Sequence, residues 1–132
     1  MHKKILIIGG GVAGVCLAHQ LKKQNQYIML VDDGMNVSSV VAAGIVHPMS
    51  FRRTLLSWNA NPFYFEAKSF YLEMEAILSA TFYHPIMVRR LFASKEESVC
   101  WNQRIEQTEF KPFMHPIPPD DIAFEPFGSG RV

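Results

Sequence analysis

The sequence carries almost no net charge. Thirteen basic and twelve acidic side chains give its 132 residues a formal net charge of +1. A field this weak does not attract the phosphate backbone of nucleic acid or an anionic membrane surface. The doublets Arg52-Arg53 and Arg89-Arg90 are too short to change this balance. We therefore predict neither nucleic acid nor a membrane surface as a partner.

Cysteine is scarce. The two cysteines, Cys16 and Cys100, lie in segments that we expect to be helical, and neither belongs to a Cys-x-x-Cys motif or lies near a pair of suitably spaced histidines. A disulfide framework needs more cysteines than this, and structural zinc needs ligands in a recognisable spacing. We predict no disulfide scaffold and no metal site.

Long hydrophobic runs are also missing. No stretch approaches the roughly twenty apolar residues that a membrane span requires. Lys3-Lys4 and the apolar run that ends at Ala18 resemble a secretory signal peptide, which is one possible interpretation. However, glycines at positions 9, 10, 11 and 14 disfavour a continuous apolar helix there. We therefore expect a cytoplasmic protein.

What the sequence does contain is enough apolar material for one globular domain, or for one domain and a fragment of a second. Hydrophobic residues make up 48% of the chain and charged residues 19%. A chain of this length buries roughly two-thirds of its unfolded surface on folding.

The N-terminal part has the pattern of a βαβ unit. Residues 3–8 form a short apolar run rich in β-branched side chains, typical of a strand that is buried on both faces. Residues 12–24 place small and apolar side chains on one helical face, and residues 27–31 are again continuously apolar. Two parallel strands joined by a right-handed helical crossover are expected, so the fold class is α/β.

The middle of the chain predicts a long helix. Residues 38–43 suit one or two helical turns, and residues 44–48 suit a loop. Asn61 is the expected N-cap of the long helix, with Pro62 at its first position. Apolar side chains then recur at steps of three and four residues, and nine of the sixteen aromatic residues lie between positions 51 and 83. We expect this aromatic stripe to pack in the core, the alternative being the lining of a pocket.

The C-terminal third differs in amino-acid composition from the rest of the chain. Residues 85–93 are rich in β-branched and aromatic side chains, and Ser94 with Glu97 has the form of a capping box for a helix over residues 95–105. Five of the eight prolines lie between positions 112 and 126, which predicts extended or loop structure. Residues 128–132 resemble the beginning of a strand.

A glycine pattern carries the chemistry. Gly9, Gly11 and Gly14 form a Gly-x-Gly-x-x-Gly string between the first predicted strand and the first predicted helix. Such a string allows a tight turn, a close approach of backbone to a pyrophosphate, and close packing of helix on strand. Asp32 follows Gly9 by 23 residues, where a carboxylate can bind a ribose. Its neighbour Asp33 adds a second negative charge, which disfavours the phosphorylated ribose of NADP.

The glycine string has a plainer interpretation. Three glycines at this spacing also occur in strand-to-helix turns of other α/β proteins, and Asp32 before Gly34 also suits an ordinary turn. The strand-turn-helix context and the acidic residue together favour nucleotide binding.

A second motif makes the pattern more specific. Ser38-Ser39-Val40-Val41-Ala42-Ala43-Gly44-Ile45 follows the βαβ unit. Together with Ile-Ile-Gly-Gly-Gly-Val-Ala-Gly at the N-terminus, this segment resembles the D-amino-acid oxidase and glycine oxidase family of FAD-dependent oxidoreductases. The resemblance is strong over residues 3–48 and loose to about residue 93.

The resemblance implies FAD in the nucleotide cleft. Residues expected on its ADP half are Gly9, Gly11, Gly14 and Asp32. Val12, Ala13 and Asp33 are also expected to bind the cofactor. Residues expected toward the pyrophosphate and the flavin ring are Ser38, Ser39, Ala42, Ala43, Gly44 and Ile45. The implied activity is hydride transfer from the carbon of an amine or amino acid to the flavin, and no catalytic side chain can be named.

The chain is short for this family, so we expect it to be the N-terminal portion of a longer flavoprotein, a naturally shortened relative being the alternative. Residues 1–82 are then the first part of the FAD-binding domain, and residues 83–132 the beginning of a partly β substrate domain with a proline-rich tail. The chain alone is expected to be inactive. Two other functions stay open: an NAD-linked dehydrogenase, and a non-catalytic nucleotide-binding module that completes its sheet as a homo-oligomer.

Overall fold

The computed structural model describes residues 4–35, 38–50, 52–116 and 129–131. The chain divides into two compact units, Met1–Val46 and His47–Val132. This division falls earlier in the chain than the domain boundary that the sequence predicts after residue 82. That boundary stays a prediction.

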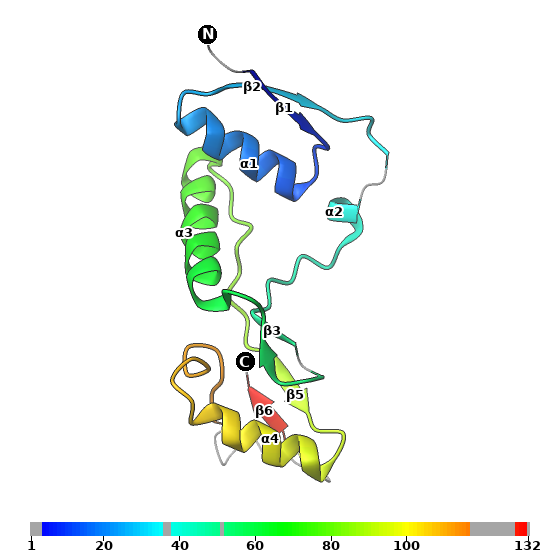
Figure 1. The fold of residues 1–132 in the computed structure, drawn as a ribbon, viewed down its shortest axis with the longest axis vertical. Helices are drawn as coiled ribbons and strands as arrows, with labels where there is room; N and C mark the ends of the chain where they lie inside the picture. The colour runs from blue at the N-terminus through cyan, green and yellow to red at the C-terminus, as the bar shows by residue number, and fades with distance from the viewer. Residues whose placement is uncertain (1–3, 36–37, 51, 117–128, 132) are drawn as a thin grey trace. The chain divides into compact units, whose positions relative to one another are not determined.

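The first unit is built on a βαβ motif, as predicted. Strand β1 (Lys4–Ile8) leads through a glycine-rich turn into helix α1 (Val12–Lys23), and strand β2 (Tyr27–Val31) follows. The strands are parallel, with Lys4 opposite Tyr27 and Ile8 opposite Val31. Figure 1 shows α1 (blue) lying along the β1–β2 pair. The chain is therefore an α/β protein.

The two faces of this small sheet differ in exposure. Ile7 is 7% exposed and lies next to Gly14 of α1, which shows that its face is the one covered by the helix. Strand residues alternate between faces, so every second side chain of β1 and its in-register partners in β2 lie on the other face. These side chains are between 49% and 83% exposed: Leu6, Ile8, Tyr27, Met29 and Val31.

The first unit ends with a short helix and a loop. Helix α2 (Ser38–Val41) is one turn long, and the amide of Ala42 continues it by donating to the carbonyl of Ser38 at 2.9 Å. Residues 43–47 have no regular structure. Both features agree with the sequence prediction.

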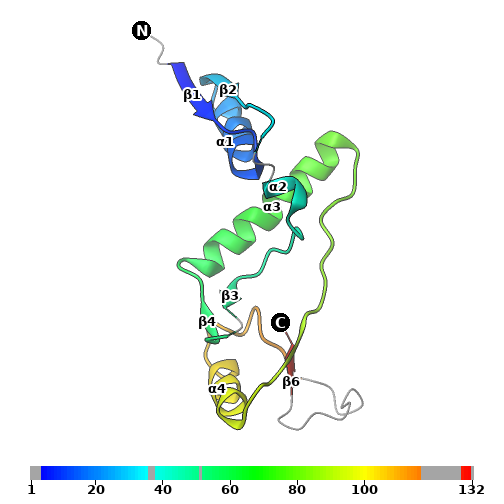
Figure 2. The ribbon, with the colours of Figure 1, turned by 90° about the vertical axis from the view of Figure 1, so that its right-hand side faces the viewer.

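In its described residues, the second unit combines two small antiparallel sheets with two helices. Strand β3 (Met49–Ser50) pairs with β4 (Leu55–Leu56), and helix α3 (Ala60–Leu78) follows. Strand β5 (Arg89–Leu91), helix α4 (Lys95–Ile105) and strand β6 (Ser129–Arg131) complete the unit. Strand β6 pairs with β5, so the predicted strand at the end of the chain is confirmed for residues 129–131. Figure 2 shows α3 in green and α4 in yellow from a second direction.

The core of the second unit is aromatic. Trp101 on α4 is 2% exposed, and its ring centroid lies 5.4 Å from that of Phe92. The buried residues of this cluster are Met49, Phe92, Trp101, Phe110 and Met114. Burial of the Trp101 and Phe92 side chains stabilises the folded state by roughly several kcal/mol. This cluster therefore holds α4 against the rest of the second unit.

Helix α4 begins at the predicted residue. The hydroxyl of Ser94 accepts the amide hydrogen of Glu97 at 3.3 Å, which is the first half of a capping box. The second half differs from the expected form, because the Glu97 carboxylate accepts the amide of Ala93 at 2.7 Å and binds Arg90 with N–O distances of 2.8 and 2.7 Å. The capping glutamate thus also joins α4 to β5.

Two predictions for α3 are wrong. The helix begins at Ala60 after Asn59, so Asn61 is not the N-cap; its side-chain amide instead donates to the carbonyl of Glu109 at 3.1 Å. Pro62 is tolerated at the third position because amides in the first turn have no partner within the helix.

The aromatic stripe of α3 is also not the core, because Ala60 is the buried residue of this helix. Phe63 is 53% exposed and Ile77 is 58% exposed. Helical spacing shows that apolar side chains share a face, but it does not specify what covers that face.

The helices of the described residues include none that is both long and apolar enough to cross a bilayer. The prediction of extended structure over the prolines from position 117 to 126 lies outside the described residues.

Candidate functional site

The glycine-rich turn between β1 and α1 is the centre of the candidate site. Gly9 has a φ of +104°, a conformation that side-chain-bearing residues rarely adopt. Its amide donates to the carbonyl of Val31 at 2.8 Å, which holds the turn against the end of β2. The end of the parallel sheet and the start of the helix therefore meet at this residue.

Gly14 allows the helix to approach this turn. A Cβ atom built on Gly14 would lie 1.9 Å from the carbonyl oxygen of Gly9 and 3.5 Å from the side chain of Ile7. The first distance is far below any real contact between these atoms, so a hydrogen atom is the only substituent that fits. The last glycine of the string is thus required by packing of helix on turn, as the sequence predicted.

The N-terminus of α1 is suited to bind an anion. Gly11 is the N-cap, and no acidic side chain lies in the first turn, which contains Val12, Ala13 and Gly14. The first amides of a helix have no partner within it, and the helix dipole adds a partial positive charge there. A phosphate group is a typical ligand for such an end.

Asp32 connects β2 to the glycine-rich turn. Its Oδ2 accepts the amide of Gly10 at 2.5 Å, and its Oδ1 accepts the amide of Gly34 at 2.8 Å. These two bonds, with the one from Gly10 the stronger cause, lower the pKa of Asp32 below the usual value for an aspartate. The side chain is therefore a carboxylate acceptor at neutral pH.

Gly10 also belongs to the site, although the glycine fingerprint does not require it. A Cβ on Gly10 would lie 3.1 Å from the Asp32 carboxylate, so this glycine leaves room for the acidic side chain. The signal was available, because Gly10 makes three glycines consecutive where the fingerprint requires only the first and third. Asp33, in contrast, points to its own turn, where its Oδ1 accepts the amide of Met35 at 2.8 Å.

Ser39 brings α2 to the same turn. Its hydroxyl accepts the amide hydrogen of Val12 at 3.0 Å, although the residues are 27 positions apart. A Cβ on Gly11 would lie 3.0 Å from this hydroxyl oxygen. The hydroxyl therefore lies directly over the start of α1.

The other predicted members of this segment do not hydrogen-bond to the turn within the part of the chain that the structure describes. Ser38 starts α2, and Ala42 and Ala43 follow the helix. Gly44 has a φ of +69°, and the side chain of Ile45 is 61% exposed. The structure thus joins Gly9–Gly14, Asp32 and Ser39 into one cluster and leaves Asp33 and residues 42–45 beside it.

Most of this chain matches one known protein family. The family model described as FAD dependent oxidoreductase, DAO, matches residues 4–126. The chain belongs to the FAD dependent oxidoreductase family. No curated protein matches it, and no solved structure does. The family resemblance predicted from the glycine string and the Ser-Ser to Ala-Ala-Gly segment is therefore confirmed, and the match extends well beyond residue 48.

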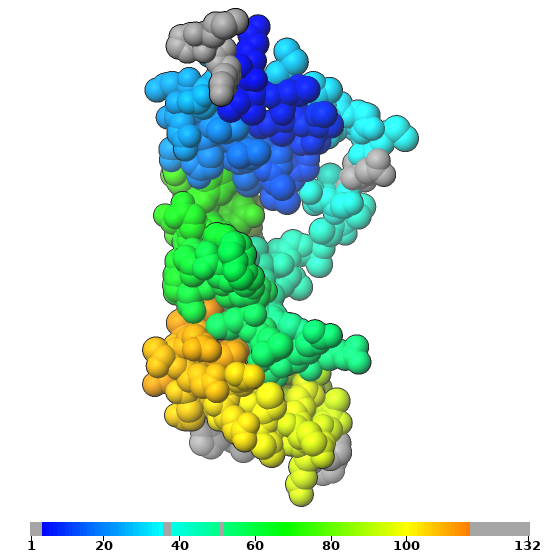
Figure 3. All heavy atoms as spheres, viewed as in Figure 1, coloured from blue at the N-terminus to red at the C-terminus, as the bar shows by residue number. Residues whose placement is uncertain are grey.

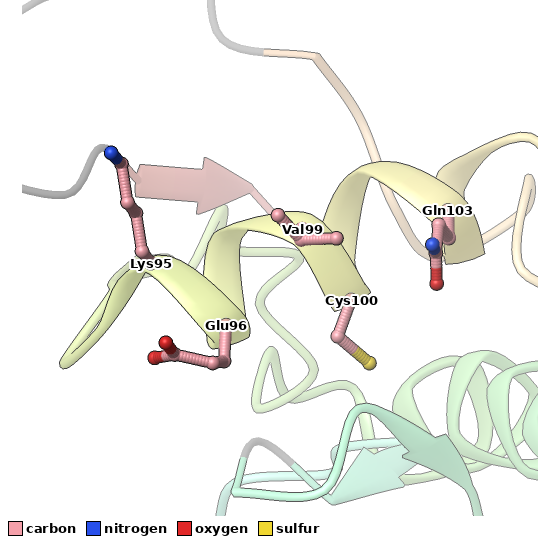
Figure 4. A pocket seen from close by; sticks show the side chains of 5 residues that line it. All are labelled: Lys95, Glu96, Val99, Cys100 and Gln103. Carbon is pink, nitrogen blue, oxygen red and sulfur yellow. The ribbon is translucent and has the colours of Figure 1, made fainter.

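A hollow on the second unit does not form a second candidate site. It has a volume of about 440 Å³ and is lined by Lys95, Glu96, Val99, Cys100 and Gln103, all from α4. Figure 3 shows α4 (yellow) at the molecular surface. In Figure 4 the side chain of Lys95 points to one side of the helix, and those of Glu96, Cys100 and Gln103 point to the other. These side chains do not converge on a common point. Among the described residues there is also no group of three or more metal-ligating side chains.

Proposed function

We propose that the first unit binds FAD at the glycine-rich turn, with the pyrophosphate at the N-terminus of α1. The observation that carries this proposal is the contact between Gly14 and Gly9, where a Cβ would lie 1.9 Å from a carbonyl oxygen. Such close packing brings the helix amides to the edge of the sheet, within a segment that the family model matches.

Asp32 is the proposed acceptor for a hydroxyl of the adenosine ribose. Each carboxylate oxygen accepts one backbone amide and keeps a second lone pair for a ligand. Because the lowered pKa keeps the group ionised, it accepts hydrogen bonds and repels a phosphate. Together with the adjacent charge of Asp33, this favours FAD or NAD over NADP, and membership of the family favours FAD over NAD.

Six residues after β2 are the proposed contact toward the pyrophosphate and the flavin: Ser38, Ser39, Ala42, Ala43, Gly44 and Ile45. The positive φ of Gly44 is a conformation in which the chain turns without a side chain. Ser38, Ser39, Ala42, Ala43 and Ile45 supply small or apolar neighbours on either side of it. Backbone can therefore approach a planar ring closely here.

The proposed reaction is the oxidation of an amine or amino acid. When bound, FAD would supply the two-electron acceptor for the hydride of the carbon that carries the amine, and the amine would become an imine that water hydrolyses. The residues of this chain bind and orient the cofactor, and we assign none of them to proton transfer. Residues 1–82 are proposed as the first part of the FAD-binding domain and residues 83–132 as the beginning of the substrate domain.

The direct test is the visible absorption spectrum of the purified protein after incubation with FAD and desalting. A flavin band that stays with the protein supports the proposal, and dissociation constants for FAD, NAD and NADP then give the order of preference. A folded protein that retains no flavin and binds FAD no better than NADP would contradict it. Flavin-retaining protein is next mixed with a panel of amines and amino acids, and bleaching of the flavin band reports oxidation.

Gly44 separates flavin binding from binding of the nucleotide half. We expect Gly44→Val to weaken FAD binding strongly while ADP binding remains, because the substitution strains a backbone at φ +69° beside the proposed ring position. Val40→Ala is the matched control, since Val40 is 79% exposed on the preceding helix. Equal FAD affinity in Gly44→Val and wild type would remove this segment from the flavin site.

A further inference from the structure

The β1–β2 pair has an apolar face that points away from α1. Helix α1 covers the face that contains Ile7. The other face, the outer face, consists of three cross-strand pairs in register: Lys4 with Tyr27, Leu6 with Met29, and Ile8 with Val31. Parallel strands occur almost only in sheets that are covered on both faces. The outer face therefore needs a second apolar layer.

The outer face is large enough to form an interface. Its five apolar side chains are between 49% and 83% exposed. If a large side chain has about 200 Å² of surface, these fractions leave roughly 600 Å² of apolar surface in water. A standard protein interface buries about 800 Å² on each partner. The apolar centre and the charged residues at its rim together reach this size.

The two ends of the outer face carry opposite charges. Lys4 is exposed at the beginning of β1, and Asp33 is exposed two residues after the end of β2. When two such faces meet with their strands antiparallel, the Lys4 end of each copy lies over the Asp33 end of the other. With the strands parallel, like charges meet instead, which is unfavourable. The outer face is thus complementary to a second copy of itself in the antiparallel arrangement.

We propose that the outer face is the interface of a two-fold symmetric dimer of this chain, in which two β1–β2 pairs pack face to face with antiparallel strands. A two-fold interface uses the same patch on both copies. Sheets that pack in this way lie about 10 Å apart, with interdigitating side chains. Leu6 and Met29, the middle pair of the face, then lie at the centre of the interface. The inference is independent of the proposed function, because the dimer does not require bound FAD.

Met29→Arg tests the centre of the interface. It introduces a charge that has no acceptor there, so we expect the dissociation constant of the dimer to rise at least about 100-fold. Ile77→Arg is the matched control, because Ile77 on α3 is 58% exposed and Met29 is 62% exposed. Met29→Ala adds no charge and is expected to raise the dissociation constant about three- to tenfold. It replaces the arginine variant if that variant does not fold.

A charge exchange tests the direction of the strands. Lys4→Glu and Asp33→Lys each bring like charges together, so each is expected to raise the dissociation constant about three- to tenfold. The double variant has both charges exchanged and is expected to regain the wild-type dissociation constant. Thermal unfolding of each variant checks that it folds, since Asp33 also accepts the amide of Met35.

The measurement is sedimentation equilibrium of the full chain and of each variant at micromolar concentrations. A wild-type mass of twice 15.0 kDa, lost in Met29→Arg and kept in Ile77→Arg, supports the interface. A wild-type monomer overturns the proposal, since another protein or another segment must then cover the outer face. A dimer that survives Met29→Arg overturns it as well, because the copies then meet elsewhere. A double variant as weak as the single charge variants overturns the antiparallel arrangement.

Discussion

The Cβ position of Gly14 lies 1.9 Å from the carbonyl oxygen of Gly9, five residues earlier in the chain. This contact fixes how closely α1 approaches the turn that follows β1. Because the obstructing atom belongs to the backbone, it cannot move aside as a flexible side chain does. The close approach of helix, turn and strand in the first unit therefore depends on a missing side chain.

Gly14→Ala is expected to lower the free energy of unfolding by about 2–4 kcal/mol, because the added methyl group forces the helix away from the turn. Urea unfolding followed by circular dichroism measures the loss. Val15→Ala is the control, since Val15 is 53% exposed on the same helix and its truncation costs at most about 0.5 kcal/mol. A stability of Gly14→Ala equal to that of the control would contradict the close contact.

Asp32 predicts a specific response to acid. The amides of Gly10 and Gly34 lower its pKa in the folded protein, so its contribution to stability is complete above the ordinary aspartate value of about 3.9. This contribution is lost as the pH falls below that value and through the lowered pKa. In Asp32→Asn the contribution is absent at every pH, so its melting temperature falls less than that of wild type between pH 5 and pH 2.

Other carboxylates in the protein also respond to acid, so the comparison must be made between variants. The pKa values of Glu75 and Glu97 are lowered as well, in Glu75 mainly by the amides of Tyr83 and Phe82. Asp33→Asn is the matched control because Asp33 adjoins Asp32 in the sequence, while its carboxylate accepts the amide of Met35 within its own turn. Identical pH profiles for Asp32→Asn and wild type would show that the bonds to Gly10 and Gly34 do not stabilise the folded state.

Glu97 joins the start of α4 to β5, and its removal is expected to be costly. Burial acts to raise the pKa of Glu97, but the Ala93 amide and the Arg90 guanidinium together outweigh it, and the pKa is lowered. Glu97→Ala leaves Arg90 and the Ala93 amide without this acceptor, so stability falls by about 1–2 kcal/mol. Lys95→Ala, at an exposed position of the same turn, should change it by no more than about 0.5 kcal/mol.

The experiment for Glu97 is urea unfolding at pH 7 and at two salt concentrations. The loss in Glu97→Ala is expected to decrease at high salt, because part of it comes from the ion pair with Arg90. A loss no larger than that of Lys95→Ala would mean that the pair contributes nothing measurable.

The two tryptophans provide a matched test of the core of the second unit. Trp101 is 2% exposed and Trp58 is 84% exposed. Trp101→Ala leaves a cavity beside Phe92 and is expected to cost about 3–5 kcal/mol in the free energy of unfolding. Trp58→Ala removes an edge contact with Phe63 from an exposed position and should cost less than about 1 kcal/mol. Similar losses in the two variants would place the core elsewhere.

Local patterns were sufficient for several elements. The apolar runs of β1 and β2 and the glycine string between them predicted the βαβ unit, because buried parallel strands and tight turns restrict the residues that can form them. Ser94 and Glu97 predicted the first residue of α4, since capping is an interaction between near neighbours. The family resemblance was likewise carried by short contiguous motifs.

Other features depended on contacts that no local pattern encodes. Strands β3 and β4 have two residues each, too few for a detectable alternation, and were not predicted. The stripe on α3 showed a shared apolar face, but the core formed instead around Trp101 and Phe92. Periodicity describes one surface, whereas burial needs a second surface that fits it.

The candidate site also has some features that local sequence determines and others that depend on tertiary contacts. The sequence by itself determined the turn glycines Gly9, Gly11 and Gly14 and the acidic residue after the second strand, because backbone conformation and strand ends constrain those positions. Only the tertiary structure decided that Asp32 bonds to the Gly10 amide and that Ser39 bonds to the Val12 amide. Both bonds join residues more than twenty positions apart, and such pairs meet only when the intervening helix and strand have packed.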